Sequence, residues 1–465
     1  MKLPPSLKTP AWLQMLHWIA NPFTFLDSCA QAYGDCFCVR IGINFAPIVV
    51  VSNPITLQQI YTANPEQIDA PGEKNKLLGI AQGGENALVL ASGVRHQCQR
   101  QLIMPSFHGE RIRNYGQLIE NITEQAICQW KIGKRFLVQD AMKTISLRII
   151  LSTVFGLEID KPRYQQMEKL LISMLEMMSS SWQASMLFFP ILQQDLGALS
   201  PWGRFRRCQK EIDRLLYAEI QERRNDFDLS RTDVLTSLIA ARYETGEQMT
   251  DVELRDELVN LLIAGHETTA TTLTWALYWI HKLPTVRKKL VQEINSLENQ
   301  SDKSAILQLP YLNAVCSETL RMYPVGVVTF PRVVNSPLQL MDYYFPAGTD
   351  IYPCPYLTHQ REDLYPEPKQ FKPERFLERK FSPYEYLPFG GGSRRCIGMA
   401  FALFEMKVIL AKILSRFQLA LDNHHPVRPI RRTLLTGPSN VWLVPRSECK
   451  QISEKLNIDN LVITN

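Results

Sequence analysis

Length, composition and charge exclude several classes of protein. The chain has 465 residues, of which 45% are hydrophobic and 21% charged, so it can bury a large core and is neither a disordered nor a coiled-coil protein. Length alone predicts roughly three domains, but the absence of repeats, Gly/Ser linkers and like-charge blocks favours one large domain. The net charge of +5 is spread along the chain without a dense basic block, which argues against a nucleic-acid partner.

The chain also carries signals about its compartment. The Met1 end contains Lys2, and its apolar stretch at 11–20 is interrupted by Gln14 and His17, so it lacks the apolar core of a signal peptide. No segment reaches the ~18 uninterrupted apolar residues that a membrane span requires. The ten cysteines form no CxxC pair and no zinc-finger spacing. We therefore expect a soluble, cytoplasmic protein with reduced thiols and no transmembrane segment.

Helical and proline-rich segments follow one another along the chain. Apolar residues recur at three and four spacing from 105 to about 309, which predicts a mainly helical body, and helix is predicted again at about 397–417. The segment 324–388 leaves room only for short strands, turns and a long meander, because it contains eleven prolines, at 324, 331, 337, 346, 353, 355, 366, 368, 373, 383 and 388. Strand-like runs predict a small β portion built from both chain ends, at 36–41, 48–51 and 441–444.

One predicted helix is much longer than the others. Thr250 and Glu253 form a capping box and Pro284 ends the helix, which gives about thirty residues and a length of ~45 Å. Its middle, 261–270, is apolar on nearly every face, yet it contains residues that weaken a helix interior or are costly to bury, namely Gly265, His266, Glu267, Thr268 and Thr269. Two interpretations stay open: a functional site, or a satisfied polar network in the core with a packing glycine.

The strongest chemical signal is the glycine-rich loop 389–398, Phe-Gly-Gly-Gly-Ser-Arg-Arg-Cys-Ile-Gly. Its glycines let the chain curl tightly, and Cys396 comes just before the helix predicted from Ile397. The N–H groups and the dipole at a helix N-terminus lower the pKa of a thiol. The pattern therefore predicts a thiolate that can act as a metal ligand or a nucleophile, and the alternative is a buried, inert cysteine.

The spacing in this loop resembles the haem-binding loop of the cytochrome P-450 haem-thiolate monooxygenases. Its pattern is Phe-x-x-Gly-x-Arg-x-Cys-x-Gly, and every fixed position is matched, by Phe389, Gly392, Arg394, Cys396 and Gly398. The resemblance extends over 21–446 and implies the cytochrome P-450 fold: mainly α with a small β portion, with haem between the long central helix and the Cys-ligand loop. We expect one haem-thiolate monooxygenase domain over 1–446 and a C-terminal tail of unknown role over 447–465.

Two further motifs of this family occur in the order that the family requires. Glu318 and Arg321 are three apart on a helix, and with Arg375 of the segment 371–376 they resemble the buried ion network that positions the meander below the haem. The segment 264–269, Ala-Gly-His-Glu-Thr-Thr, resembles the oxygen-activation motif. The functional interpretation of the long helix is therefore favoured over the purely structural one.

The resemblance also implies the cofactor, haem b (iron protoporphyrin IX), and the residues that hold it. Its two propionates need cations or hydrogen-bond donors, for which the family matches suggest His96, Arg100, Arg332 and Arg394. His96 departs from the Trp common at that position, although bacterial members often carry His. A solvated helix face is the alternative for His96 and Arg100. The other expected cofactor contacts are Ala264, Phe389, Gly398 and Cys396, the last being the metal ligand.

The expected reaction follows from the placement of Cys396 and the long helix on opposite faces of the haem. The Cys396 thiolate pushes electron density onto the iron, which favours cleavage of a bound O–O bond. The resemblance makes Glu267 and Thr268 catalytic, with Glu267 as the proton relay and Thr268 able to hydrogen-bond the carbonyl of Ala264, while Gly265 lets backbone approach the bound oxygen. One oxygen atom of O2 would enter the substrate, by hydroxylation or epoxidation, and the other would leave as water.

The substrate and the electron source are less sharply specified. By resemblance the pocket is lined by Ala264 and by stretches rich in Leu, Val, Met and Phe, at 77–90, 174–189, 325–330 and 434–436. They imply a lipophilic substrate such as a fatty acid or terpenoid, as in similar bacterial, especially cyanobacterial, members, although methionines at helical spacing are also typical of plain core. The chain has no flavin or iron–sulfur motif, which implies an external ferredoxin or flavodoxin with its reductase, docking at Arg395 and at arginines 95, 111 and 113.

Two alternatives to a monooxygenase stay open. A haem-thiolate peroxygenase or isomerase of the same fold usually lacks the acid–alcohol pair that Glu267 and Thr268 resemble. A haem-based gas sensor would normally carry an output domain, for which the sequence offers no candidate.

Overall fold

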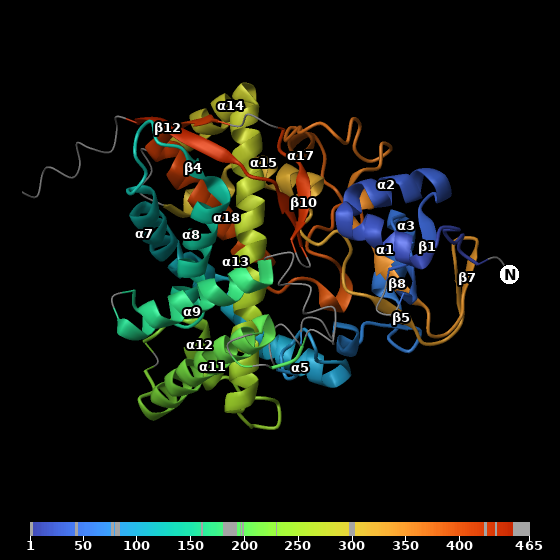
Figure 1. The fold of residues 1–465 in the computed structure, drawn as a ribbon, viewed down its shortest axis with the longest axis horizontal. Coiled ribbons are helices and arrows are strands. Elements are labelled where there is room, and N and C mark those ends of the chain that lie inside the picture. Colours follow the sequence, from blue (N-terminus) through green and yellow to red (C-terminus); the bar gives the residue numbers. More distant parts are fainter. Residues whose placement is uncertain are drawn as a thin grey trace, which may run out of the picture.

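The computed structural model describes most of the chain and is mainly helical (Figure 1). It describes residues 3–41, 45–75, 79, 84–159, 161–179, 193–195, 197, 200–228, 230–296, 303–422, 426–432 and 435–449. Its helices are α1 Ala11–Ala20, α2 Pro22–Tyr33, α3 Pro54–Thr62, α5 Gly93–Ile103, α6 Glu110–Asn114, α7 Gly116–Ile127, α8 Val138–Thr153, α9 Pro162–Ser179, α11 Pro201–Asn225, α12 Val234–Ala240, α13 Asp251–Lys282, α14 Pro284–Asn295, α15 Pro310–Met322, α16 Pro355–His359, α17 Arg375–Glu378 and α18 Met399–Arg416.

The strands are short and form separate small sheets. They are β1 Cys36–Arg40, β2 Pro47–Val51, β3 Ile68–Asp69, β4 Phe136–Leu137, β5 Arg332–Val334, β6 Leu338–Leu340, β7 Tyr343–Phe345, β8 Asp350–Pro353, β9 Phe417–Leu421, β10 Pro429–Arg432, β11 Leu435–Pro438 and β12 Trp442–Glu448. The largest sheet has the order β1-β2-β8-β5-β3, and β4-β12-β9, β10-β11 and β6-β7 form the others. Mainly helical architecture with a small β portion was the prediction, and it is confirmed.

Helix α13 runs through the whole helical body (Figure 1). It has 32 residues, which corresponds to about 48 Å. The predicted capping box is present: the Glu253 N–H donates to Thr250 Oγ1 at 3.2 Å, and the Thr250 N–H donates to Glu253 Oε2 at 2.9 Å. Because these bonds satisfy donors that a helix start leaves unpaired, they fix where α13 begins.

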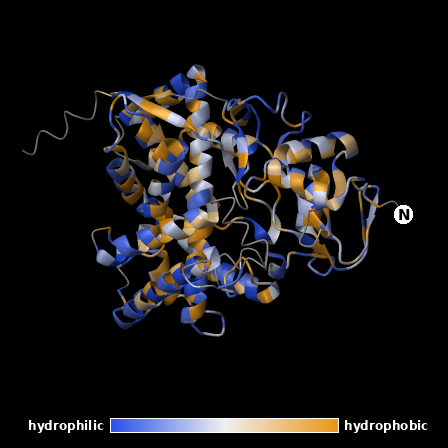
Figure 2. Ribbon diagram, viewed as in Figure 1, coloured by the Kyte–Doolittle hydropathy of each residue, from blue (hydrophilic) through white to orange (hydrophobic). Residues whose placement is uncertain are grey.

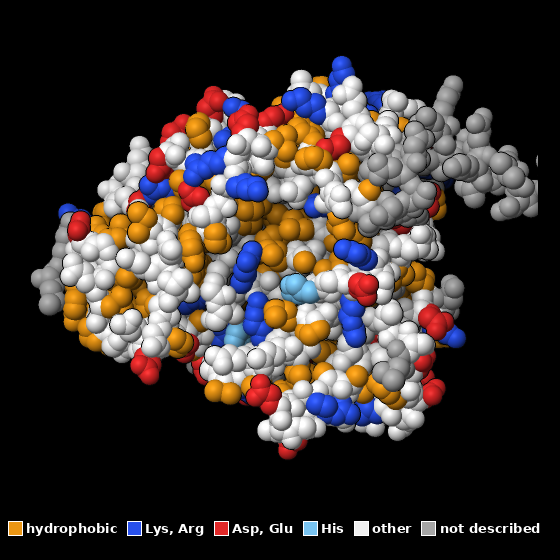
Figure 3. All heavy atoms as spheres, turned by 180° about the vertical axis from the view of Figure 1, so that it is seen from behind, with side chains coloured by type: hydrophobic (Ala, Val, Ile, Leu, Met, Phe, Trp, Pro, Cys, Tyr) orange, Lys and Arg blue, Asp and Glu red, His pale blue; other side chains and the backbone are white. Residues whose placement is uncertain are grey.

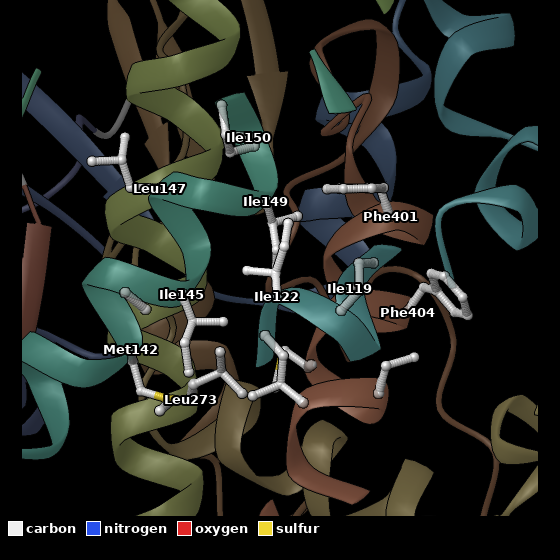
Figure 4. Packing of buried hydrophobic residues seen from close by; sticks show 14 of the residues in the cluster. Ile119, Ile122, Met142, Ile145, Leu147, Ile149, Ile150, Leu273, Phe401 and Phe404 are labelled. Carbon is white, nitrogen blue, oxygen red and sulfur yellow. The ribbon is translucent and has the colours of Figure 1, made fainter. Parts of the chain in front are cut away.

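The main hydrophobic core packs around α13. Figure 4 shows side chains from α7, α8, α13 and α18 meeting in this core, among them Ile122, Ile145, Leu273 and Phe401. Each of them is at most 5% exposed. Burial of one such side chain contributes about 1.5–3 kcal/mol, so this core holds the long helix firmly in place.

The two chain ends do not build one β portion, so that part of the prediction is wrong. The predicted strands exist, but β1 and β2 join the sheet of β8, β5 and β3, whereas β12 pairs with β4 and β9 on the other side of α13 (Figure 1). The reason lies in the connections. Helix α18 leads directly into β9 and thereby holds β12 beside the helical body, while the strands between the prolines at 331 and 353 supply the partners of β2.

The C-terminal strand passes the boundary expected at 446. Ser447 pairs with Gln418 and Glu448 with Phe417, and the N–H of Cys449 donates to the Arg416 carbonyl at 3.0 Å. The residues 450–465 of the expected tail lie outside the described part of the chain. None of the described helices is both long enough and apolar enough to cross a membrane.

Candidate active site

The loop before α18 closes on itself and presents Cys396. The Cys396 N–H donates to the Phe389 carbonyl at 3.0 Å, which folds the glycine-rich segment into a tight turn. Gly392 takes a positive φ of 63°, a conformation that favours glycine. A Cβ at Gly391 would lie 2.7 Å from the ring of Tyr61, so only glycine fits there. The outcome is an exposed Cys396 side chain on a rigid loop.

The pKa of Cys396 differs from the sequence-based expectation. Helix α18 begins at Met399 with Gly398 as its N-cap, two residues later than predicted, so the cysteine stands further from the helix N-terminus than expected. Desolvation raises the pKa of the thiol, while the Gly398 N–H and the charges of Arg100 and Arg395 lower it less strongly. The predicted net lowering is therefore wrong for the protein alone. A metal cation held by Cys396 would supply the missing stabilisation of a thiolate.

Four basic side chains gather next to this loop, and they are the four predicted to hold propionates. His96 is 5% exposed, Arg332 4% and Arg394 9%, while Arg100 is half-buried. Burial, together with the positive charges of Arg394, Arg100 and Arg332, lowers the pKa of His96 to about 4. Desolvation, with repulsion from Arg332 and Arg100, lowers the pKa of Arg394 to about 10, although Asp69 and Glu73 oppose this. The structure thus brings together residues from three distant parts of the sequence.

Backbone carbonyls hold two of these arginines. Arg394 donates to Ala70 at 2.9 Å and to Leu88 at 3.1 Å, and it also bonds Ala91. Arg332 donates to the Gly391 carbonyl of the cysteine loop at 2.9 Å. Carbonyl oxygens satisfy guanidinium N–H groups without neutralising the positive charge.

The other two members keep their polar atoms available. Within the described residues, neither the Arg100 guanidinium nor the His96 ring makes a side-chain hydrogen bond, and none of the three arginines forms an ion pair with a carboxylate. The solvated-face alternative does not fit His96, which is buried. Figure 3 shows a recess with a hydrophobic floor and with basic side chains and histidines around it. Basic side chains without carboxylate partners could hold an anionic group.

A second network, on the meander, places a buried carboxylate between two arginines. Arg321 Nε donates to Glu318 Oε2 at 2.6 Å, and Arg375 Nε donates to Glu318 Oε1 at 3.2 Å. Glu318 and Arg321 are both fully buried. Arg321 also donates to the carbonyls of His359 and Pro368, at 2.7 and 2.8 Å. The predicted ion network is present, and it ties α15 to the segment that precedes the cysteine loop.

Comparison with known proteins agrees with this geometry. A family model described as Cytochrome P450 matches residues 4–444. The chain belongs to the cytochrome P450 family. It is 36% identical to putative cytochrome P450 135B1 of Mycobacterium tuberculosis over 439 residues, which cover 94% of this chain and 90% of that protein. It is 33% identical to putative cytochrome P450 135A1 of the same organism, over 96% of each chain.

Solved structures share the fold of this P450. Retinoic acid-bound cyanobacterial CYP120A1 has a TM-score of 0.82 with 23% sequence identity, covering 96% of this chain and 100% of that one. The haem domain of a cytochrome P450DA mutant has a TM-score of 0.83 with 20% identity, covering 96% and 98%. The protein is a P450 monooxygenase, an enzyme that uses haem, O2 and electrons from a redox partner.

The residues of this P450 fit a haem group. A bound haem supplies the iron that activates O2, with a cysteine thiolate as its protein ligand. The exposed thiol of Cys396 suits that role, and the positive charge of Arg100, Arg332 and Arg394, which Asp69 and Glu73 offset only in part, suits the two propionates. These are observations of this chain, independent of the family match.

The central turn of α13 is accessible at Ala264. The neighbouring residues of the helix are largely buried, but Ala264 is exposed. Thr268 Oγ1 donates to the Ala264 carbonyl at 2.6 Å, which is the hydrogen bond that the sequence analysis predicted. Such back-bonding competes with the helical ladder and places a hydroxyl beside Ala264.

Glu267 has a partner that the sequence did not reveal. Lys143 Nζ of α8 lies 3.3 Å from Glu267 Oε1, and the two side chains are 23% and 14% exposed. His266 also contacts α8, since its Nε2 lies 3.1 Å from the Lys143 carbonyl. No local signal identifies Lys143, because it lies more than 120 positions away in the chain. The carboxylate is therefore tied to a cation that is itself partly open to solvent.

Gly265 lies where α8 packs closely against α13. A Cβ added there would lie 2.7 Å from Cδ1 of Ile150 on α8. The glycine therefore lets the two helices approach without displacing the end of the Ile150 side chain. This contact supports a packing role, and the expectation that Gly265 also lets backbone approach bound oxygen stays a prediction.

Part of the expected substrate lining forms one pocket. Gly326, Val327, Val328, Leu435 and Thr436 line it, together with Trp18, Pro22 and Arg431. Met174 and Met178 instead belong to the main core, at 1% and 7% exposure, so plain core is the better interpretation of those methionines. The expected lining at 77–78, 80–83, 180–189 and 434 lies outside the described residues.

Two acids of α13 hold the segment 84–91 above the site. The Leu88 N–H donates to Glu257 Oε2 at 2.7 Å, and the Asn86 N–H donates to Asp256 Oδ2 at 2.9 Å. Because Arg394 binds the Leu88 carbonyl, this segment connects α13 to the cysteine loop. Sequence reasoning missed both acids, although adjacent carboxylates in an otherwise apolar helix were a usable signal.

Proposed function

We propose that this P450 inserts one oxygen atom of O2 into a lipophilic substrate such as a fatty acid or terpenoid, by hydroxylation or epoxidation. The observation that supports the proposal is that the stretches at 326–328 and 435–436, which the resemblance places at the substrate site, are mainly apolar and line one small cavity together with Trp18, Pro22 and Arg431. Such a lining favours an apolar ligand. The domain responsible is residues 1–446, and the proposed compartment is the cytoplasm, in keeping with ten free thiols.

The cofactor in this proposal is haem b, with Cys396 as its sole protein ligand. Haem b has an apolar ring, and its two propionates make one edge of the ring anionic. The cluster of His96, Arg100, Arg332 and Arg394 suits that edge. Ala264, Phe389 and Gly398 are the proposed neighbours of the ring. Covalent attachment is not proposed, because the chain has no CxxCH sequence.

Replacement of the cysteine tests the ligand directly. Cys396→Ser removes the thiolate, so the reduced, CO-treated protein should lose the strongly red-shifted Soret band that thiolate ligation produces. Cys354→Ser is the matched control, since that buried thiol lies away from the loop. A red-shifted band that survives in Cys396→Ser would assign the ligand elsewhere.

Proton handling is assigned to Thr268 and Glu267. The Thr268 hydroxyl accepts or passes a proton beside Ala264, and Glu267, steadied by Lys143, exchanges protons with solvent. Electrons come from an external ferredoxin or flavodoxin with its reductase. Arg95, Arg111, Arg113 and Arg395 are exposed and suit an acidic partner.

Thr268→Ala separates proton delivery from substrate binding. The variant should keep the substrate-induced spin shift nearly intact, while product formed per NAD(P)H consumed falls about tenfold. Thr272→Ala is the control, because Thr272 makes the same type of back-bond, to the Thr268 carbonyl at 2.9 Å, one turn further along. Unchanged coupling in Thr268→Ala would make this threonine a packing residue. Product formation with peroxide alone, at the rate of the complete redox chain, would favour a peroxygenase.

A further inference from the structure

Helix α1 has an inverted pattern of burial. Its one buried residue is a glutamine, Gln14, which is 1% exposed. Trp12, Leu16 and Ile19, spaced four and three apart on one face, are 58%, 53% and 50% exposed. A surface helix normally turns such residues toward the core. Figure 2 shows hydrophobic residues along α1 in the N-terminal part of the molecule.

Specific hydrogen bonds hold the helix in this orientation. Gln14 Nε2 donates to the Thr9 carbonyl at 2.7 Å, and Gln14 Oε1 accepts from the Arg40 N–H at the end of β1, also at 2.7 Å. Because both ends of the buried amide are satisfied, rotation of α1 to bury Trp12 instead would leave these groups unpaired at a cost of about 1–3 kcal/mol each. The apolar face of α1, defined as Trp12, Leu16 and Ile19, is therefore kept outward by the fold.

The charges next to this face are mainly basic. Helix α1 contacts α2, β1 and β10, and Arg431 of β10 lies over the Trp18 ring at 5.5 Å. Among the described residues of this region, Lys8, Arg40, Arg428 and Arg431 are basic, and the acid of α2, Asp27, pairs with Lys369. Lys8, Arg40 and Arg428 are exposed, and so is Ile430 of β10, at 39%. The surface is thus apolar with a basic surround.

We propose that the apolar face of α1 rests on an anionic lipid surface, with the surrounding basic residues at the level of the headgroups. An apolar helix face with tryptophan and a lysine- and arginine-rich border is the arrangement that binds membrane interfaces without spanning them. A second copy of the chain docked through the same face fits less well, because a twofold contact would bring the two sets of basic residues together.

Vesicle sedimentation tests the proposal on the full-length, haem-loaded protein. The probes are vesicles of phosphatidylcholine alone and of an equimolar mixture with phosphatidylglycerol. Wild-type protein should sediment with the anionic vesicles, and partitioning should fall about tenfold without phosphatidylglycerol or in high salt. The combined variant Trp12→Ser, Leu16→Ser, Ile19→Ser should lose at least about tenfold.

A matched variant controls for the loss of exposed apolar area. Ile132→Ser, Phe227→Ser and Leu377→Ser replace three side chains that are 51%, 42% and 49% exposed on other parts of the molecule. This control should bind vesicles like wild type, and both combined variants should retain the wild-type melting temperature and CO-bound spectrum. Equal partitioning of the two combined variants would overturn the proposal.

Two other possible occupants of the apolar face of α1 would give different results. If the face joins two copies, wild type is dimeric in sedimentation velocity, the α1 variant is monomeric, and neither binds vesicles. If the face receives an acidic protein, wild type stays in the supernatant with both kinds of vesicle. Either result overturns a lipid-facing role for α1.

Discussion

Two sets of buried arginines in this P450 have different kinds of hydrogen-bond partner. Arg321 is fully buried, and the carboxylate of Glu318 balances its charge at 2.6 Å. Arg332 and Arg394 are nearly as buried, but within the described residues they bond carbonyl oxygens and no carboxylate. The first set is complete in the protein alone. The second carries positive charge that the protein leaves for another group to neutralise.

This difference in partners gives a way to distinguish arginines that stabilise the fold from arginines that bind a ligand. A buried ion pair is strongly disrupted when one partner is removed, because the other charge is left uncompensated. Removal of a cation from a like-charged cluster relieves repulsion instead. The predictions below use that contrast: a loss of folding stability on one side, and a loss of haem with intact folding on the other.

Arg321→Ala should give the largest effect. It leaves the Glu318 carboxylate buried without its closest cation, at a cost on the order of 3–5 kcal/mol, so we expect a large fall in melting temperature together with haem loss. Arg379→Ala is the control, because Arg379 pairs with Glu385 at the surface and is 47% exposed, where an ion pair contributes about 0–1 kcal/mol. Denaturant unfolding of both variants measures the difference. Equal unfolding midpoints would remove the contrast between the two sets of arginines.

Both sets of arginines were named from the sequence, but only the structural set also follows from local geometry. Glu318 and Arg321 lie three apart on one helix, so their contact follows from helical geometry, and the family spacing added Arg375. The same local logic predicted the capping box of α13 and the bond from Thr268 to Ala264. In each case the partners are near one another in the chain, or a motif fixes their distance.

Most contacts between segments that are distant in the chain could not be predicted from the sequence. Lys143 meets Glu267, and Ile150 explains Gly265, only because α8 packs along α13, and no pattern in either helix specifies that register. The sheet pairing failed for the same reason, since a strand's sequence does not name its partner. The net pKa shift of Cys396 depends on desolvation by the protein atoms around the loop, which the sequence motif does not specify.

Arg100→Gln should give an intermediate effect and sharpen the comparison. Arg100 adds positive charge beside Arg394 and His96, so its loss should leave the melting temperature of the haem-free protein unchanged or slightly raised. Haem affinity should fall about tenfold, as expected for one charge-assisted contact. Haem transfer to an acceptor protein measures the affinity, with Arg113→Gln as the control at an exposed position. A haem-free protein destabilised as strongly as by Arg321→Ala would place Arg100 in the structural set.

The smallest expected effect is a pH dependence that reports the charge of the cluster. Burial and the three arginines lower the pKa of His96 to about 4, below its ordinary value of 6.5. Between those values the unfolded chain takes up a proton that the folded protein does not, so folding stability falls as pH drops from 6.5 toward 4. Burial also lowers the pKa of His266, His281 and His359, so His96→Gln should remove only one proton's share of the slope, about 1.4 kcal/mol per pH unit at most.

Haem binding should change how much His96 contributes to the pH dependence of folding stability. If propionates neutralise the cluster, the arginines repel a proton on His96 less, so the pKa of His96 rises toward its ordinary value and its share of the slope shrinks in the haem-loaded protein. His96→Gln should then alter the slope in the haem-free form and much less in the loaded form, while His108→Gln, at an exposed position, should alter neither. Urea unfolding at several pH values, with and without haem, measures all of these slopes. The same effect of His96→Gln in both forms would mean that the cations around His96 stay uncompensated when haem is bound, and the propionates would then have to lie elsewhere.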